Sequence, residues 1–191
     1  IDSAQIFVYG LSAGAAMTAV LLATYPETFN AGAVLAGGPY KMATGAMSGL
    51  NAIVKSKQRS AKEWGQLVKN DNPNYKGNYP RLVVCHGKKD KVVNPKNSYE
   101  LIKQWSDLTG TDTVPTKTLS AFNKNTDIEK KIYCTKNGVE KIFFYEVNKL
   151  GHALMIDPGE PTTQGGETGL FSVDKDFFST YWIAKDFGLI P

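Results

Sequence analysis

The pentapeptide Gly10-Leu11-Ser12-Ala13-Gly14 is the stretch of this sequence with the clearest chemistry. It matches the pattern G-x-S-x-G and stands where a β-branched and aromatic run gives way to a helical pattern. The serine is therefore expected on a strained strand-to-helix turn, with its hydroxyl projecting above a sheet. A side chain in place of the hydrogen of Gly10 or Gly14 is expected to crowd this turn. The N–H of Ala13 is expected to be an oxyanion donor. An ordinary small-residue turn is the alternative.

A serine nucleophile at neutral pH needs a base and a carboxylate that orients the base. The chain has two histidines, His86 and His152. With this turn the chain order is Ser, then Asp or Glu, then His, so His152 is predicted to be the base. Asp90 is predicted to be the carboxylate, because it follows an intervening strand by four residues. Four other acidic residues lie on a helix, in a polar connector or after the histidine: Asp107, Asp112, Asp127 and Asp157. A loop-capping carboxylate and a solvated loop histidine are the alternative interpretations.

The elements that must position these residues alternate along the chain. Apolar runs predict strands at 5–10, 31–35, 81–86, 130–134 and 139–147. Helical patterns lie at 13–24, 47–57, 60–69, 95–108 and 174–187. Residues 109–125 and 151–169 are expected to be irregular connectors. This order indicates an α/β fold, a mostly parallel sheet with helices on both faces, in which sites lie at the carboxyl ends of strands. No linker or repeat is evident, so residues 1–191 are expected to form one domain.

The composition excludes several classes of protein. The 191 residues are 42% apolar and 21% charged, which is typical of a globular domain and not of a collagen or a disordered tail. No apolar run approaches the roughly 20 residues that a membrane span needs. The net charge of +4 is carried mainly by interspersed lysines, so nucleic-acid binding is not expected. Neither cysteine spacing suggests a metal site. A buried free thiol is favoured for Cys85, and a disulfide with Cys134 stays open.

The residues in these positions resemble those of the α/β-hydrolase esterases related to polyhydroxybutyrate depolymerases and to feruloyl and acetylxylan esterases. The resemblance covers most of the chain. It rests on four segments that follow the family's order and on a closing helix. They are 6–29 for the nucleophile strand, elbow and helix, 36–40 for the next loop, 86–95 for the acid loop, 151–153 for the histidine loop and 181–183 for the helix.

The resemblance implies hydrolysis of carboxylic esters through an acyl-serine intermediate. Ser12 would attack the carbonyl carbon, His152 would take its proton, and Asp90 would orient the imidazole. No metal or organic cofactor is implied, and the implied partner is an ester, either small or linked to a polyester or polysaccharide. Tyr40 and Leu154 are candidates for lining an acyl or aryl pocket, with packing as the alternative. An extracellular location is suggested by the resemblance alone.

The sequence departs from the family pattern at its beginning. The family places several strands before the nucleophile strand and takes a second oxyanion N–H from a loop there, whereas this chain starts at the nucleophile strand with Ile1. The strand at 5–10 would then have an open edge. We expect a fragment of a longer protein; a nicked two-chain enzyme and a permuted arrangement completed by a symmetry mate are the alternatives. Two other functions stay open, a non-catalytic binding or assembly domain of this fold and a serine peptidase.

Overall fold

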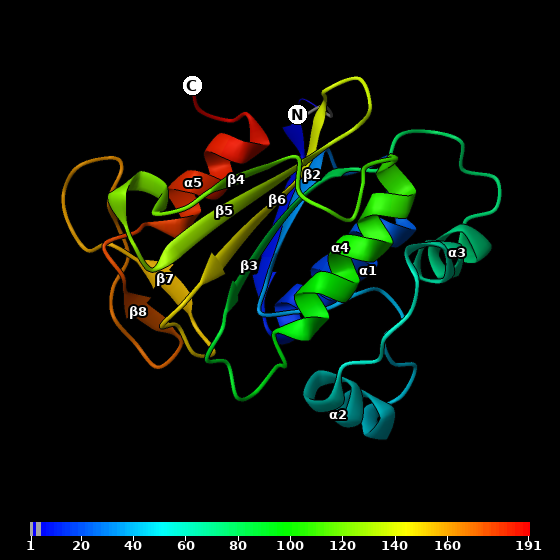
Figure 1. Cartoon of the computed structure of the whole chain (residues 1–191), viewed down its shortest axis with the longest axis horizontal. Coiled ribbons are helices and arrows are strands. Elements are labelled where there is room, and N and C mark those ends of the chain that lie inside the picture. The colour runs from blue at the N-terminus through cyan, green and yellow to red at the C-terminus, as the bar shows by residue number, and fades with distance from the viewer. Residues whose placement is uncertain (1, 3–4) are drawn as a thin grey trace.

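The computed structural model describes residue 2 and residues 5–191, and Ile1, the first residue of the sequence, lies outside the described part. The main sheet has the strand order β1-β2-β3-β6-β5-β4 (Figure 1). The first four strands in this order pair in parallel, and β5 and β4 add antiparallel pairs at one edge. The bounds of these strands are Phe7–Leu11 for β1, Ala31–Leu35 for β2, Arg81–Gly87 for β3, Lys117–Leu119 for β4, Ile128–Cys134 for β5 and Glu140–Val147 for β6. The predicted mostly parallel sheet is therefore confirmed.

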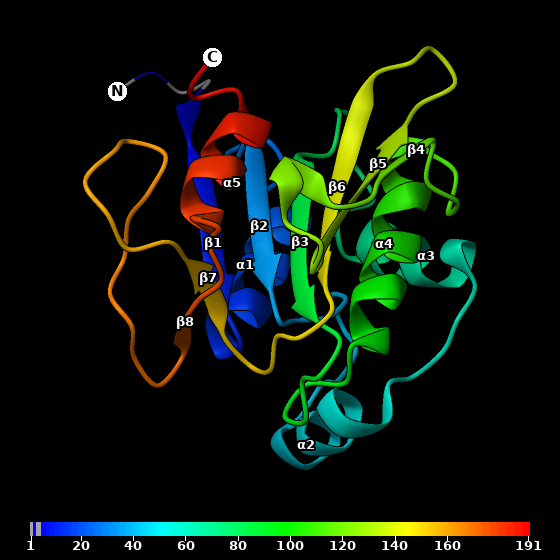
Figure 2. The ribbon, with the colours of Figure 1, turned by 60° about the vertical axis from the view of Figure 1, so that its left-hand side comes forward.

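Helices cover both faces of the sheet (Figure 2). On one face lie α1, α3 and α4, and on the other lies α5, while α2 lies beyond the carboxyl ends of the strands. The helices are α1 (Ala13–Thr24), α2 (Ala46–Lys55), α3 (Ala61–Asp71), α4 (Lys96–Thr109) and α5 (Ser179–Phe187). This arrangement leaves the loops at the carboxyl ends of β1, β2, β3 and β6 at one end of the molecule.

Two apolar clusters, one on each face, hold these layers together. Successive side chains of a strand point to opposite faces, so β3 sends Val83 toward the cluster with α5 and Val84 toward the cluster with α1, α3 and α4. The central strands are apolar on both faces because helices cover both. Trp64 of α3 and Trp105 of α4 are fully buried in or beside the second cluster. This packing makes the sheet a rigid support for its end loops.

The short elements were not predicted from the sequence. They are β4, a 3-10 turn at Phe122–Lys124, β7 (Leu154–Ile156) and β8 (Ser172–Asp174). Each has three residues, which is too short for a periodic pattern. The prediction that the last helix begins at 174 is wrong, because Asp174 pairs with Ile156 and the helix begins at Ser179. Long-range pairing therefore replaced the local helical tendency of this segment.

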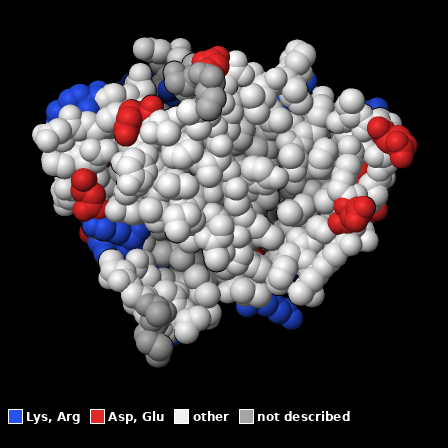
Figure 3. All heavy atoms as spheres, turned by 180° about the vertical axis from the view of Figure 1, so that it is seen from behind, with Lys and Arg blue, Asp and Glu red and all other residues white. Residues whose placement is uncertain are grey.

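The edge of the sheet at β1 is open within the described part of the chain. Of the strands described, only β2 pairs with β1. Exposed apolar side chains lie on β1, on α1 and directly after α1: Tyr9, Met17, Val20 and Tyr25. The molecule seen from behind shows a broad face with few charged side chains in its middle (Figure 3). The open edge that the sequence predicts is therefore present.

Two further sequence predictions concern cysteines and membrane spans. Both cysteines are free, and Cys85 is buried, as predicted. Burial raises the pKa of the Cys85 thiol, so it stays protonated. None of the described helices combines the length and the apolar character that crossing a membrane requires.

Candidate active site

Ser12 occupies the strained turn that the sequence predicts. It stands alone between the end of β1 and the start of α1, with φ 58° and ψ −115°. A non-glycine residue in such a conformation costs on the order of 1–3 kcal/mol, which the surrounding structure must offset. The Ser12 N–H donates to Leu35 O of β2 at 3.0 Å, which fixes the turn to the sheet.

The two glycines of the motif differ in their steric role. A Cβ at Gly10 would lie 2.4 Å from the carbonyl carbon of Gly14, so the predicted crowding is confirmed there. A Cβ at Gly14 would meet nothing within 4 Å, so the same prediction is wrong for that residue. The backbone of Gly14 is the obstacle for a side chain at Gly10. Only the first glycine is required by the geometry of the turn.

A small apolar pocket of about 190 Å³ opens beside Ser12 and Ala13. Ala13 is the first residue of α1, and N–H groups in the first turn of a helix have no acceptor within the helix. The positive end of the helix dipole lies at the same place. The other lining residues come from α1, the loop after β2, α2 and the acid loop: Ala16, Ala36, Gly37, Met42, Ile53, Val92 and Val93. An oxyanion that develops at Ser12 would therefore face an unpaired N–H and an apolar wall.

The carboxylate of Asp90 is held in a tight loop after β3. Its side chain is fully buried. The N–H groups of Val92 and Val93 donate to Oδ1 at 2.8 and 2.9 Å. The other oxygen, Oδ2, lies 2.8 Å from Nδ1 of His152. The structure thus brings together the two residues that the sequence predicts as acid and base, although 62 positions separate them.

Backbone contacts bind the loop of Asp90 to the loop of His152. The N–H of Lys88 donates to Val147 O at 2.8 Å, and the N–H of Lys89 donates to Leu150 O at 3.0 Å. Gly87 allows this approach, because a Cβ there would lie 2.2 Å from Leu150 O. The parallel pairing of β3 with β6 places both loops at the same end of the sheet.

The environment keeps Asp90 ionised. Burial opposes the charge, but contacts with His86 and His152 and the N–H groups of Val93 and Val92 outweigh it and hold the pKa of Asp90 well below its usual range. A carboxylate at Nδ1 of His152 requires the ring proton on that nitrogen, which leaves Nε2 with a free lone pair. The neutral ring of His152 in this tautomer presents Nε2 as the proton acceptor.

Tyr40 and Leu154 do not line the pocket beside Ser12. The Tyr40 hydroxyl donates to Asp71 at 2.8 Å, and burial together with this carboxylate raises the pKa of Tyr40 to about 12. Its backbone N–H and carbonyl bond the side chain of Gln104. Leu154 lies on β7, where its N–H donates to Phe171 O. The pocket-lining residues that sequence reasoning missed, such as Ile53 on α2, carry no sequence signal beyond being apolar.

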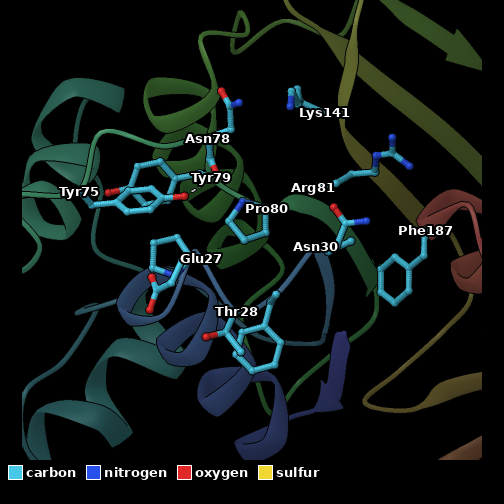
Figure 4. A pocket seen from close by; sticks show the side chains of 13 residues that line it. Glu27, Thr28, Asn30, Tyr75, Asn78, Tyr79, Pro80, Arg81, Lys141 and Phe187 are labelled. Carbon is cyan, nitrogen blue, oxygen red and sulfur yellow. Dashed lines mark hydrogen bonds between the residues drawn. The ribbon is translucent and has the colours of Figure 1, made fainter. Parts of the chain in front are cut away.

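A larger pocket of about 430 Å³ lies at the opposite end of the sheet (Figure 4). Loops before β2 and β3 and the end of α5 surround it, and its walls include Glu27, Tyr75, Arg81, Lys141 and Phe187. These residues belong to the amino ends of the strands, whereas Ser12 follows the carboxyl end of β1. This pocket is separate from Ser12 and from the pair of Asp90 and His152.

Three carboxylates from β7, β8 and their flanks lie within 4.8 Å of one another: Asp157, Asp174 and Asp176. They are partly or fully exposed, as solvated acidic groups commonly are. Asp157, one of the alternatives for the triad acid, therefore lies with other acidic groups and not with His152.

The sheet, its helices and a serine on a strand-to-helix turn define the α/β-hydrolase fold. The family model of the prolyl oligopeptidase family matches residues 1–119, so the chain belongs to that family. The matched range contains Ser12 and Asp90 and ends before His152.

Curated relatives and a solved structure extend this likeness over the whole chain. A poly(3-hydroxyalkanoate) depolymerase C from Paucimonas lemoignei is 34% identical over 192 residues, which are 100% of this chain and 45% of that protein. A feruloyl esterase B from Neurospora crassa is 37% identical over 58% of this chain and 40% of its own length. The structure of an acetyl xylan esterase from Aspergillus awamori has a TM-score of 0.69 and 28% identity, covering 79% of this chain and 55% of that one. The chain thus spans less than half the length of the two curated relatives, and the resemblance to this group of esterases is confirmed.

Proposed function

We propose that this protein is a serine hydrolase that cleaves carboxylic esters with the triad Ser12, Asp90 and His152. The observation that carries the proposal is the 2.8 Å contact between Asp90 Oδ2 and His152 Nδ1, at the same end of the sheet as the strained turn of Ser12. The three residues follow one another in the order expected for this fold. Relatives named as depolymerases and esterases support the choice of ester over other acyl compounds.

The reaction proceeds in two halves. In the first, Ser12 Oγ attacks the ester carbonyl carbon while His152 Nε2 takes its proton, and the N–H of Ala13 donates to the oxyanion. The intermediate collapses when His152 returns that proton to the leaving alkoxide, so the alcohol departs and an acyl-serine remains. In the second half, water attacks the acyl carbon, His152 takes a proton from the water and passes it to Ser12 Oγ. The products are a carboxylic acid and an alcohol, and the buried charge of Asp90 stabilises the imidazolium in both halves.

The pocket beside Ser12 favours a short acyl group. Its volume of about 190 Å³ is small, and Ala13, Ala16, Ala36 and Gly37 contribute only small side chains or none to its wall. An acetyl or short hydroxyacyl group fits such a space better than an aromatic acid. A series of p-nitrophenyl esters from acetate to decanoate tests this assignment, with kcat/KM expected to fall as the chain lengthens.

Covalent labelling tests the nucleophile. A fluorophosphonate probe is expected to label the complete encoded protein, and Ser12→Ala is expected to abolish both labelling and ester turnover. Ser120→Ala is the matched control, because Ser120 is exposed. Esterase activity that survives Ser12→Ala would exclude the triad, and a folded wild-type protein without turnover or labelling would favour a non-catalytic domain.

A peptidase is the second candidate, because the matching family is that of prolyl oligopeptidase. Ester and amide substrates with the same acyl group separate the two functions. Faster cleavage of the amide, corrected for its lower intrinsic reactivity, would favour the peptidase. An extracellular location stays a prediction, and detection of the protein in culture medium against cell lysate tests it.

A further inference from the structure

His86 is buried against the triad, although it cannot be the triad base. It lies at the carboxyl end of β3, and 2% of its surface is exposed. Its Nε2 is 3.1 Å from Val93 O and 3.2 Å from Asp90 Oδ2. Its Nδ1 is 2.5 Å from Ser98 Oγ of α4. Of the two ring nitrogens, Nε2 therefore faces the acid loop and Nδ1 faces α4.

These partners determine which ring nitrogen of His86 carries a hydrogen. Val93 O and the ionised Asp90 carboxylate can only accept hydrogen bonds, so Nε2 carries a hydrogen. The hydroxyl of Ser98 is both donor and acceptor, and it donates to the lone pair of Nδ1 when the ring is neutral. Ser98 is itself fully buried. In the neutral ring the hydrogen therefore lies on Nε2, with this N–H directed at the acid loop.

We propose that His86 is a positioning residue that holds the Asp90 carboxylate in the plane that His152 requires. The inference rests on the proposed function. Oδ2 of Asp90 is shared between the two imidazoles, and Oδ1 accepts from the N–H of Val93. The same Nε2–H is directed at the carbonyl of Val93. His86 therefore contacts the oxygen of Asp90 that His152 also contacts, and it contacts the loop residue that holds the other oxygen.

The N–H of His86 also divides the charge on Oδ2. Without it, more negative charge faces His152, which favours the protonated imidazole. The acid limb of the pH profile of kcat/KM reports protonation of the base in the free enzyme. Loss of the N–H is therefore expected to move this limb to higher pH. Partial unfolding of the acid loop, by contrast, would separate Asp90 from His152 and would not move the limb upward.

Other charged groups lie near both histidines. Glu146 is the neighbour of His86 in the pairing of β3 with β6, and it accepts from Tyr99 and Lys131. On the acid loop, Lys88 Nζ lies 3.5 Å from Glu146, and two exposed lysines follow the same segment, at positions 89 and 91. These groups are the same in every variant compared below, so a displaced acid limb reports the change at His86.

A matched pair of substitutions tests the proposal in the complete encoded protein. His86→Gln places an amide N–H near the position of Nε2, whereas His86→Met has a similar shape and no donor. We expect His86→Met to lower kcat about 10- to 100-fold, because small errors in the placement of catalytic groups have effects of this size. KM should change less than about twofold, and the acid limb should move up by about half a pH unit or more. His86→Gln should restore most of kcat and the wild-type limb.

The outcomes are distinguishable from failure of the proposed function. If Ser12→Ala keeps esterase activity, the triad itself is wrong. If Ser12→Ala is inactive but His86→Met matches the wild type, or if Gln and Met variants lose kcat equally with no displaced limb, the role of His86 is overturned. If His86→Met does not fold, Ser98→Ala replaces it as the test variant, because it removes only the hydroxyl that donates to Nδ1 of His86. A wild-type kcat and pH profile in Ser98→Ala, with the fold retained by circular dichroism, would then overturn the proposal.

Discussion

The substitution Asp90→Asn tests the candidate site most directly. Two backbone N–H groups, from Val92 and Val93, occupy one oxygen of Asp90 at 2.8 and 2.9 Å. These donors belong to the main chain and cannot turn away, so the amide oxygen of Asn must face them. The amide NH₂ then faces His152, which must present a lone pair at Nδ1 and carry its proton on Nε2. In that tautomer His152 cannot take a proton from Ser12.

The expected loss follows from this tautomer. The wrong tautomer in a Ser-His-Asp triad lowers kcat by about 10⁴, or about 5 kcal/mol of transition-state stabilisation. The assay is the steady-state hydrolysis of p-nitrophenyl acetate by the complete encoded protein, with circular dichroism to verify the fold. Asp112→Asn is the matched control. Asp112 Oδ1 also accepts a backbone N–H in a loop, from Val114 at 3.0 Å, but Asp112 lies outside the site. A folded Asp90→Asn protein with kcat within tenfold of the wild type would refute the reasoning.

The same residue predicts a pH dependence of stability. The pKa of Asp90 lies below its usual range in the folded protein, because the hydrogen bonds to the carboxylate outweigh its burial. A group with a lowered pKa stabilises the fold above its unfolded pKa of about 3.9 and loses that contribution as the pH falls below it. The difference in free energy of unfolding between the wild type and Asp90→Asn should therefore be full at pH 7 and shrink below about pH 4. A difference that grows on acidification would contradict the inferred ionisation.

Three further predictions concern backbone contacts and a buried ion pair. Gly10→Ala should destabilise the protein and remove activity, whereas Gly14→Ala should leave melting temperature and turnover nearly unchanged, since only the first Cβ meets backbone; equal melting temperatures would contradict the clash. Gly87→Ala should lower kcat more than it lowers the melting temperature, because it separates the acid and histidine loops; unchanged turnover of p-nitrophenyl acetate would show that the loops adjust freely. Lys130→Met should destabilise the fold by about 3–5 kcal/mol at pH 7, because Lys130 Nζ lies 2.6 Å from the buried Asp186 carboxylate. Burial already raises the pKa of Asp186, so protonation should reduce this loss toward pH 4, as urea unfolding at both pH values would show.

Local structure around the nucleophile followed from the sequence. The predicted bounds of α1 and β2 match the structure, whereas β1 begins two residues later and ends one residue later than predicted. These elements depend on neighbouring residues, such as the run of small and apolar residues in α1 and the proline that follows it. The strained turn at Ser12 is likewise a property of one short segment, in which Gly10 leaves room for the backbone of Gly14.

The pairing of Asp90 with His152 was predicted only by chain order. Its geometry depends on β3 and β6 being neighbours, which no local pattern specifies, because α4, β4 and β5 lie between them in sequence. Tyr40 shows the same limit, since its sequence position does not reveal that its hydroxyl donates to Asp71. Which face a loop residue presents depends on contacts from distant elements.

The sequence by itself determined the class of fold, the nucleophile turn and the order of the three candidate catalytic residues. Only the tertiary structure decided which side chains surround the carboxylate, and it brought in His86, which sequence reasoning had set aside as a base. The physical reason is that local patterns encode backbone conformation and burial over a few residues. Hydrogen-bond partners of a buried carboxylate are chosen by the packing of β3, α4 and two loops, and this packing forms only when the whole sheet is assembled.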